Sequence, residues 1–219
     1  NVIDYVAIDT TGNATDFGDL TETKSDPASC SNGARGVTGG GSGPLNTLEY
    51  ITIATTGNST DFGDLSVGRS QLGACSGGGR GVFGGGDSTP IVNVIDYITI
   101  DTTGNAQDFG DLTVARREVS GCSDGSRGIF GGSGGDLSDF FAVGDIIDYI
   151  TIDTTGNATD FGDLTQARET CSTSSETRGL FAGGYDGSAV TNLIDYITIQ
   201  TTGNATDFGD LTSARGNLD

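Results

Sequence analysis

Residues 95–100 read Ile-Asp-Tyr-Ile-Thr-Ile, residues 102–105 read Thr-Thr-Gly-Asn, and residues 108–112 read Asp-Phe-Gly-Asp-Leu. This segment recurs five times in the 219-residue chain with few changes. Its tyrosines are Tyr5, Tyr50, Tyr97, Tyr149 and Tyr196, spaced 45, 47, 52 and 47 residues apart. Between them lie four copies of a second segment, in which a Cys precedes Arg-Gly, an apolar pair and a Gly cluster, at Cys30, Cys75, Cys122 and Cys171. A fixed period of this length indicates a repeat architecture.

Each unit contains four short candidate strands separated by Gly, Asn, Asp and Ser, a pattern typical of sheets. In the unit of Tyr97, the first strand surrounds Cys75, the second is 80–83, the third is 95–100 and the fourth carries 108–112. The Thr-Gly-Asn-Ala connection predicts a tight hairpin, because Gly and Asn tolerate positive φ. Four strands in about 47 residues match one blade of a β-propeller. The high content of Gly (38 residues) and the absence of Met also favour an all-β fold.

The chain has five copies of strands three and four but four copies of strands one and two. We therefore expect one domain over residues 1–219, with a half-blade (1–20), four blades (about 21–66, 67–112, 113–164 and 165–211) and a tail (212–219). A five-bladed ring is the simplest closure, and a slice of a larger propeller is the alternative. Because the chain starts at Asn1 and lacks Met, we expect it to be a segment of a longer product.

The unit resembles a kelch repeat. A strand ending in Gly84-Gly85, a strand bearing Tyr97, an outer strand with Phe109 and a closing Arg116 carry the resemblance, which covers nearly the whole chain. Kelch repeats typically have Trp on the outer strand, whereas this chain has Phe there and no Trp. The units are also similar to repeats in predicted phage and marine microbial proteins. That similarity implies a virion or extracellular, cell-surface location.

Charge and hydropathy exclude some partners. The chain has 30 acidic and 10 basic residues and a net charge of -20. We expect no nucleic-acid partner, because this charge repels phosphate backbones. We also expect no membrane partner, because anionic lipid surfaces are repelled and no run approaches the roughly 18 apolar residues of a membrane span.

The repeat also bears on metals and cofactors. The four cysteines occupy equivalent places in successive units, too far apart for disulfides, so we expect free, buried thiols. With no His and no Cys-x-x-Cys motif, we expect no metal site and no cofactor. Calcium is the alternative, because the acids also repeat. The Asn-x-Thr sequences at Asn13, Asn58, Asn157 and Asn204 are interpreted as turns, with glycosylation as the alternative.

Nine of the ten basic residues occupy repeat positions. One set ends the fourth strands: Lys24, Arg69, Arg116, Arg168 and Arg215. The other set precedes the second strands: Arg35, Arg80, Arg127 and Arg178. We expect pairing with the repeated acids Asp4, Glu49, Asp96, Asp148 and Asp195. The alternative is that the second set forms a ring of guanidinium groups that binds an anionic ligand.

The connections after the double Gly differ most between units. The longest contains Asp139, Phe140 and Phe141, and the last contains Tyr185 and Asp186. Loops on a rigid scaffold are common binding sites, so these five residues are further binding candidates. The alternative for the Phe pair is that both rings pack over a blade edge.

The sequence predicts a non-enzymatic structural or adhesive module that binds protein or glycan through its loops. We expect no catalytic residues, because no general base or nucleophile stands in a known motif. A lectin with one weak sugar site per blade is the alternative, and multivalency would strengthen its binding. A sugar-active enzyme is the third hypothesis. Self-association through open blade edges is also expected.

Overall fold

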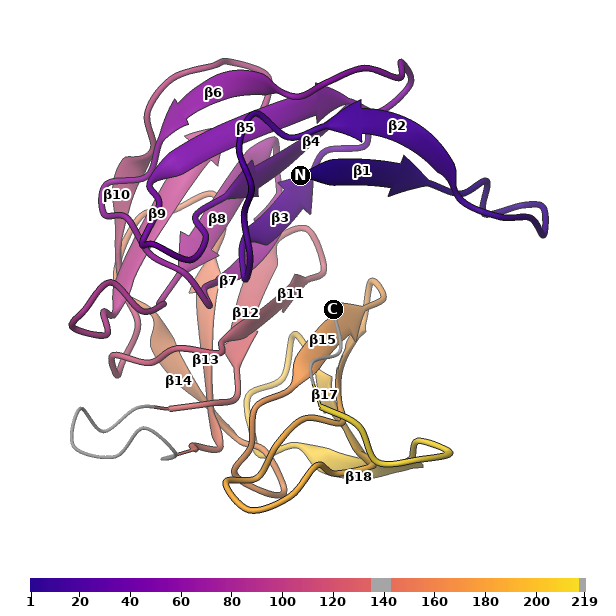
Figure 1. Cartoon of the computed structure of the whole chain (residues 1–219). Coiled ribbons are helices and arrows are strands. Elements are labelled where there is room, and N and C mark those ends of the chain that lie inside the picture. The colour runs from indigo at the N-terminus through magenta and orange to yellow at the C-terminus, as the bar shows by residue number, and fades with distance from the viewer. Residues whose placement is uncertain (135–142, 217–219) are drawn as a thin grey trace.

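The structure is a computed structural model that describes residues 1–134 and 143–216. In these residues the chain forms 18 strands and no helix, which confirms the all-β prediction. The strands make one two-stranded and four four-stranded antiparallel sheets (Figure 1). We call the two-stranded sheet the half-sheet and number the others sheets 1 to 4 in chain order.

The strand bounds repeat from sheet to sheet. The half-sheet contains β1 (Val2–Tyr5) and β2 (Thr15–Asp19). Sheet 1 contains β3 (Ala28–Ser31), β4 (Arg35–Gly39), β5 (Thr47–Thr52) and β6 (Thr60–Asp64). Sheet 2 contains β7 (Gly73–Gly77), β8 (Arg80–Gly84), β9 (Val94–Thr99) and β10 (Gln107–Asp111). Sheet 3 contains β11 (Ser120–Ser123), β12 (Arg127–Gly131), β13 (Ile146–Thr151) and β14 (Thr159–Asp163). Sheet 4 contains β15 (Cys171–Ser174), β16 (Arg178–Ala182), β17 (Leu193–Thr198) and β18 (Thr206–Asp210).

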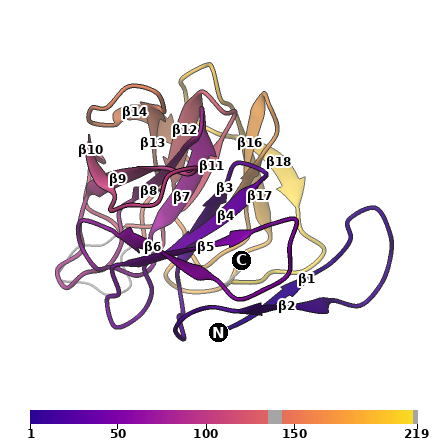
Figure 2. The ribbon, with the colours of Figure 1, turned by 90° about the horizontal axis from the view of Figure 1, so that it is seen from above.

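Successive sheets pack face to face around a common centre. The first strands β3, β7, β11 and β15 contact one another in order, and the fourth strands lie on the outside (Figures 1 and 2). Buried aliphatic and aromatic side chains fill each gap between numbered sheets. Phe83, for example, is fully buried between sheets 1 and 2. The alternation of apolar and polar residues along the repeated strands therefore builds three similar cores.

The Gly of the Arg-Gly motif is explained by the Cys of the preceding sheet. A Cβ on Gly81 would overlap Cys30 Sγ, and a Cβ on Gly128 would lie 2.7 Å from Cys75 Sγ. No larger residue fits without displacing the sulfur. The repeated Cys and the repeated Gly are thus two halves of one contact between sheets.

The connection between the third and fourth strands is longer than the tight hairpin that the sequence predicts. In sheet 2 it spans residues 100–106 and reaches across to sheet 1. There, Gly104 N donates to Phe62 O at 2.7 Å and Ala106 N donates to Asp64 O at 2.8 Å. Asn105 Oδ1 accepts from Asp64 N at 3.1 Å. The predicted hairpin is therefore present, with a local turn from Thr102 N to Thr99 O, but its loop is longer than predicted because the later loop groups bond to the neighbouring sheet.

The predicted ion pairs are confirmed for one set of basic residues. Each lies in the connection before a sheet and pairs with the acid on that sheet's third strand: Lys24 with Glu49, Arg69 with Asp96, Arg116 with Asp148, and Arg168 with Asp195. All eight side chains are buried, at 0–1% exposure. These pairs fix how each connection lies on the sheet that follows it.

The series of sheets is blade-like, but no close strand pair of the described residues returns β15 to β3. Ile8 in the half-sheet is 96% exposed and Phe208 in sheet 4 is 53% exposed, whereas their counterparts Ile100 and Phe109 are buried. The described residues thus form an open series of sheets around the common centre, and its two end members, the half-sheet and sheet 4, expose different faces (Figure 2). Closure into a five-bladed ring stays a prediction.

Candidate functional site

A shallow pocket recurs beside the loop that joins the third and fourth strands. It occurs in sheets 1, 2 and 3, with volumes of about 290, 230 and 310 Å³. The lining residues correspond by position: Tyr50, Thr55, Thr56, Gly57 and Asn58; Tyr97, Thr102, Thr103, Gly104 and Asn105; Tyr149, Thr154, Thr155, Gly156 and Asn157. The repeat therefore presents the same set of hydroxyl, amide and aromatic groups three times.

Some polar groups of these pockets already make hydrogen bonds within the chain. Tyr97 Oη donates to Gln107 Oε1 at 2.6 Å, and Asn157 Oδ1 accepts from Asp111 N at 3.1 Å. Because an amide has donors as well as an acceptor, Asn157 keeps its NH₂ group for a ligand. The threonines at the loop are exposed. These pockets can hydrogen-bond a small polyhydroxyl group and offer no buried charge.

The arginines that precede the second strands stack on the same tyrosines. Arg80 Cζ lies 4.5 Å from the ring centroid of Tyr97, and Arg80 Nη1 donates to Ile152 O in the next sheet at 2.9 Å. Arg35 and Arg127 make equivalent contacts, and Arg178 stacks on Tyr196 at 4.6 Å. The structure thus gives these predicted binding residues cation–π partners in place of the expected carboxylates. Anion binding by them stays a prediction.

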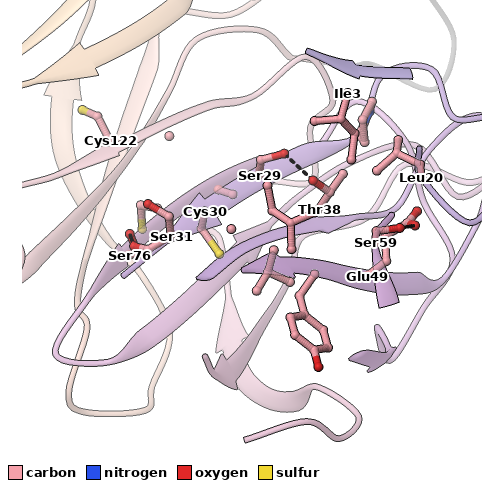
Figure 3. A pocket seen from close by; sticks show the side chains of 18 of the residues that line it. Ile3, Leu20, Ser29, Cys30, Ser31, Thr38, Glu49, Ser59, Ser76 and Cys122 are labelled. Atoms are coloured by element: carbon pink, nitrogen blue, oxygen red, sulfur yellow. Dashed lines mark hydrogen bonds between the residues drawn. The ribbon is translucent and has the colours of Figure 1, made fainter. Parts of the chain in front are cut away.

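A larger cavity of about 800 Å³ lies where the first strands meet (Figure 3). Its wall includes Ser31, Ser76 and Ser123 from three successive first strands and Ile3 and Leu20 from the half-sheet. Ser76 Oγ donates to Ser31 O at 2.8 Å, and Ser123 Oγ donates to Ser76 O at 2.6 Å. The hydroxyls of Ser76 and Ser123 have used their hydrogens in these bonds but can still accept a hydrogen bond. The cavity therefore presents a row of acceptors.

The cysteines are free, as predicted, and three of the four are buried. The predicted equivalence was wrong for Cys171, because it pairs with Ala182 and Thr173 takes the place that Cys75 has in sheet 2. Burial raises the pKa of the Cys30 and Cys122 thiols to about 12. Such thiols are protonated at neutral pH and are poor nucleophiles and metal ligands. In residues 1–134 and 143–216, no group of three or more acidic, Cys or His side chains is placed to hold a metal ion. Calcium binding stays a hypothesis of the sequence.

An acidic group lies at the end of the first strands. Asp26, Gln71 and Glu118 occupy equivalent positions two residues after Lys24, Arg69 and Arg116, and Glu169 directly follows Arg168. The pKa of Glu118 is raised to about 7, first by burial and then by the charges of Glu169 and Asp26, whereas Arg117 and a hydrogen bond from Gln71 oppose the shift. Glu118 is a titrating group inside the fold, and sequence reasoning missed it because its effect depends on burial.

The remaining binding candidates lie in the variable loops. Asp186 Oδ1 accepts from Ala189 N and Ser188 N, both at 2.8 Å, and these bonds lower the pKa of its carboxyl. Tyr185 forms an isolated bridge with Val190. The two residues thus sit in an ordered turn. Asp139, Phe140 and Phe141 lie outside the described residues.

The recurring pockets have a signal in the sequence that turn propensity alone does not reveal. The Thr-Thr-Gly-Asn loop carries two hydroxyls and an amide in every unit, more than a turn requires.

The described part of the chain has no helix that is long and apolar enough to cross a membrane. Neither a protein-family model nor a curated protein sequence matches this chain.

Proposed function

We propose that this protein is a non-enzymatic, adhesive, kelch-like β-propeller module that binds glycans through the loops between its third and fourth strands. The observation that carries the proposal is the recurrence of one pocket in three consecutive sheets. Repetition of a site within one chain suits a ligand that itself repeats, as a polysaccharide does.

The chemistry of the pockets supports a sugar. A glycan offers hydroxyl groups that both donate and accept, and Thr103, Asn105 and Tyr97 line one pocket with matching groups. The volumes of about 230–310 Å³ suit one sugar residue at a time. Because the net charge is -20, neutral or cationic glycans are favoured over sulfated or carboxylated ones.

Location follows from the resemblance to repeats in phage and marine microbial proteins. A module with several weak sugar sites is useful at the surface of a virion or a cell, where many glycan chains are presented together. We therefore propose an extracellular or virion-surface location. A tagged full-length chain, localised on intact particles or cells, tests this point.

A glycan array followed by calorimetry on the best neutral oligosaccharide tests the function. Thr56→Val, Thr103→Val and Thr155→Val each remove one hydroxyl from one pocket, so the number of sites should fall stepwise from the single to the triple variant. Thr177→Val is the matched control, because this exposed threonine lies in the turn between β15 and β16, outside these pockets. If the triple variant binds as many oligosaccharide molecules as the wild type, the proposal is refuted. Release of reducing sugar from the oligosaccharide would contradict the non-enzymatic assignment.

A protein partner is a second candidate, favoured by the cavity in Figure 3. The half-sheet lacks strands one and two, so the edge of β1 and the face of sheet 1 at Val37 and Tyr50 border the cavity. An unpaired strand edge can accept an extended strand from a partner. A synthetic peptide with the sequence of residues 73–84, which form strands one and two of sheet 2, tests this idea, because binding at the cavity should shift the signals of Ile3 and Ser29 in an NMR titration. If those signals do not move, the second candidate is excluded.

A further inference from the structure

The exposed faces at the two ends of the series of sheets are complementary, because each carries one side of the contact that joins neighbouring sheets. Inside the chain, this contact is made each time a sheet packs on the one before it. The fourth strand and second-strand arginine of one sheet meet the third strand and loop of the next. The half-sheet exposes a third strand and its loop, and sheet 4 exposes a fourth strand and a second-strand arginine, so the two ends carry the two sides of this contact.

The backbone part of the contact is repeated without change. Between sheets 3 and 4, Gly203 N donates to Phe161 O at 2.8 Å and Ala205 N donates to Asp163 O at 2.7 Å. Asn204 Oδ1 accepts from Asp163 N at 3.2 Å. The same three bonds join the half-sheet to sheet 1 and each later pair of sheets. The loop of each sheet is therefore a docking element for the sheet before it.

Two side-chain contacts accompany this backbone pattern. An arginine after the fourth strand pairs with the acid of the following third strand, as in Arg168 Nη1 to Asp195 Oδ2 at 2.9 Å. An arginine at the start of the second strand donates to the carbonyl at the end of the following third strand, as in Arg127 Nη1 to Ile199 O at 2.9 Å.

At the sheet 4 end, the donors lie in position but lack these partners. The backbone of Arg215 is held as in the other units, with Arg215 N donating to Thr191 O at 3.1 Å and Gly184 N donating to Arg215 O at 2.9 Å. Its guanidinium, however, is exposed and bonds only to Ser213 Oγ among the described residues. Arg178 is exposed as well, and a Cβ on Gly209 would meet no atom within 4 Å.

At the half-sheet end, the matching acceptors are exposed. Asp4 occupies the position of Asp195, and Ile8 occupies the position of Ile199. Asp4 is exposed, and Ile8 is 96% exposed, whereas Ile199 is fully buried. Gly12 in the loop of the half-sheet has no atom within 4 Å of the site of a Cβ.

We propose that sheet 4 of one chain binds the half-sheet of a second copy, so that the chains assemble head to tail. Arg215 then pairs with Asp4 of the second copy, Arg178 bonds to the carbonyl of Ile8, and the loop 10–14 docks on β18. The charges are complementary, and the interface continues the packing that joins the sheets within the chain. Such a heterologous contact leaves one free half at each end and therefore extends into rings or filaments.

The partner is a second copy because the exposed Arg215 and Asp4 carry the same opposite charges as the paired Arg168 and Asp195 of the chain. Its half-sheet is held on sheet 1, where Gly57 N donates to Phe17 O at 2.7 Å and Ser59 N donates to Asp19 O at 2.9 Å. In that position, Ile8 and Gly12 remain uncovered. The inference concerns different residues from the proposed glycan pockets and does not depend on them.

Light scattering of the 219-residue chain, with Asp4→Arg and Arg215→Asp, tests the proposal. The wild-type mass should rise with concentration above the 22.2 kDa of one chain. Each single variant opposes like charges across the interface and should weaken assembly about tenfold or more. An equimolar mixture of the two variants should assemble again, because the arginine introduced in one chain then meets the aspartate introduced in the other. Asp108→Arg, at an exposed acid in β10, is the control of equal charge change and should assemble like the wild type.

The other outcomes overturn the proposal. A wild-type chain that stays monomeric at every concentration has no such interface, or closes on itself. Assembly that neither variant weakens uses another surface. Loss of assembly in the single variants without recovery in the mixture excludes pairing between copies. Circular dichroism of each variant confirms that the sheets are intact, and the glycan experiment reads out a separate property.

Discussion

Arg116 Nη1 lies 3.0 Å from Asp148 Oδ2, and neither side chain is exposed to solvent. Arg116 Nη2 also donates to Phe130 O at 3.0 Å, and Thr113 Oγ1 donates to Asp148 Oδ1 at 2.7 Å. Burial lowers the pKa of Arg116, and the charge of Asp148 opposes that shift. This buried ion pair therefore joins the connection before sheet 3 to the third strand of that sheet.

Replacing Asp148 by Asn should leave the buried guanidinium without its counter-charge. Removing one partner of a buried ion pair costs about 3–5 kcal/mol, so the free energy of unfolding of Asp148→Asn should fall by about that amount. Asp4→Asn makes the same change at the equivalent exposed acid and should stay within about 0.5 kcal/mol of the wild type. Urea unfolding of dilute samples measures both. Equal effects of the two variants would show that burial of the pair does not matter.

The glycine of the fourth strand should matter only where a sheet follows. A Cβ on Gly110 would lie 2.5 Å from the carbonyl carbon and oxygen of Gly156, whereas a Cβ on Gly209 would meet nothing within 4 Å. Both glycines have positive φ, at 147° and 137°, so the backbone strain of Ala is similar. Gly110→Ala should therefore be less stable than Gly209→Ala by about 1–3 kcal/mol in thermal unfolding of dilute samples. In concentrated samples, Gly209→Ala should lose head-to-tail assembly.

The fold could be predicted from the sequence to the level of the single sheet. The strands that contain Cys75, Arg80 and Tyr97 agree with the prediction, because alternating apolar and polar residues between flanking glycines are typical of strands. The pairing of Arg69 with Asp96 was also foreseen, because opposite charges repeat with the same period.

What the sequence could not reveal depends on neighbouring sheets. The loop of Gly104 is longer than predicted, since its partner Phe62 lies 42 positions earlier in the chain. The Arg80 side chain was expected to pair with an acid, yet it stacks on Tyr97 across two adjacent strands. Local spacing does not determine either contact, because both arise from the register and packing of sheets.

The buried thiols should resist modification in the native state. At pH 8, Cys30 and Cys122 remain protonated because their pKa is about 12, and burial raises the pKa of Cys75 as well. A thiol reagent should therefore label Cys171, which is only half-buried, before the other three. Mass spectrometry of the digested protein identifies the labelled residue. In urea, all four should react together, and fast native labelling of Cys75 would contradict the packing of β7.

Glu118 should make stability depend on pH. Its pKa is raised from 4.5 to about 7 in the folded chain, so the folded state binds the proton more tightly than the unfolded state. The stabilisation from the protonated carboxyl is complete below pH 4.5 and is lost as the pH rises through about 7. Glu118→Gln keeps a neutral side chain at every pH, and Gln71 already occupies the equivalent position in sheet 2.

The variant should therefore exceed the wild type in free energy of unfolding by roughly 1–2 kcal/mol at pH 8, after allowance for solvent screening, and the difference should vanish near pH 4.5. Urea titrations at several pH values provide the measurement. Glu176→Gln, at an exposed position in the turn after β15, removes the same charge and should leave the pH dependence unchanged. If the curves of wild type and Glu118→Gln run parallel from pH 4.5 to pH 8, Glu118 titrates as it does in the unfolded chain, and the acidic group is solvated.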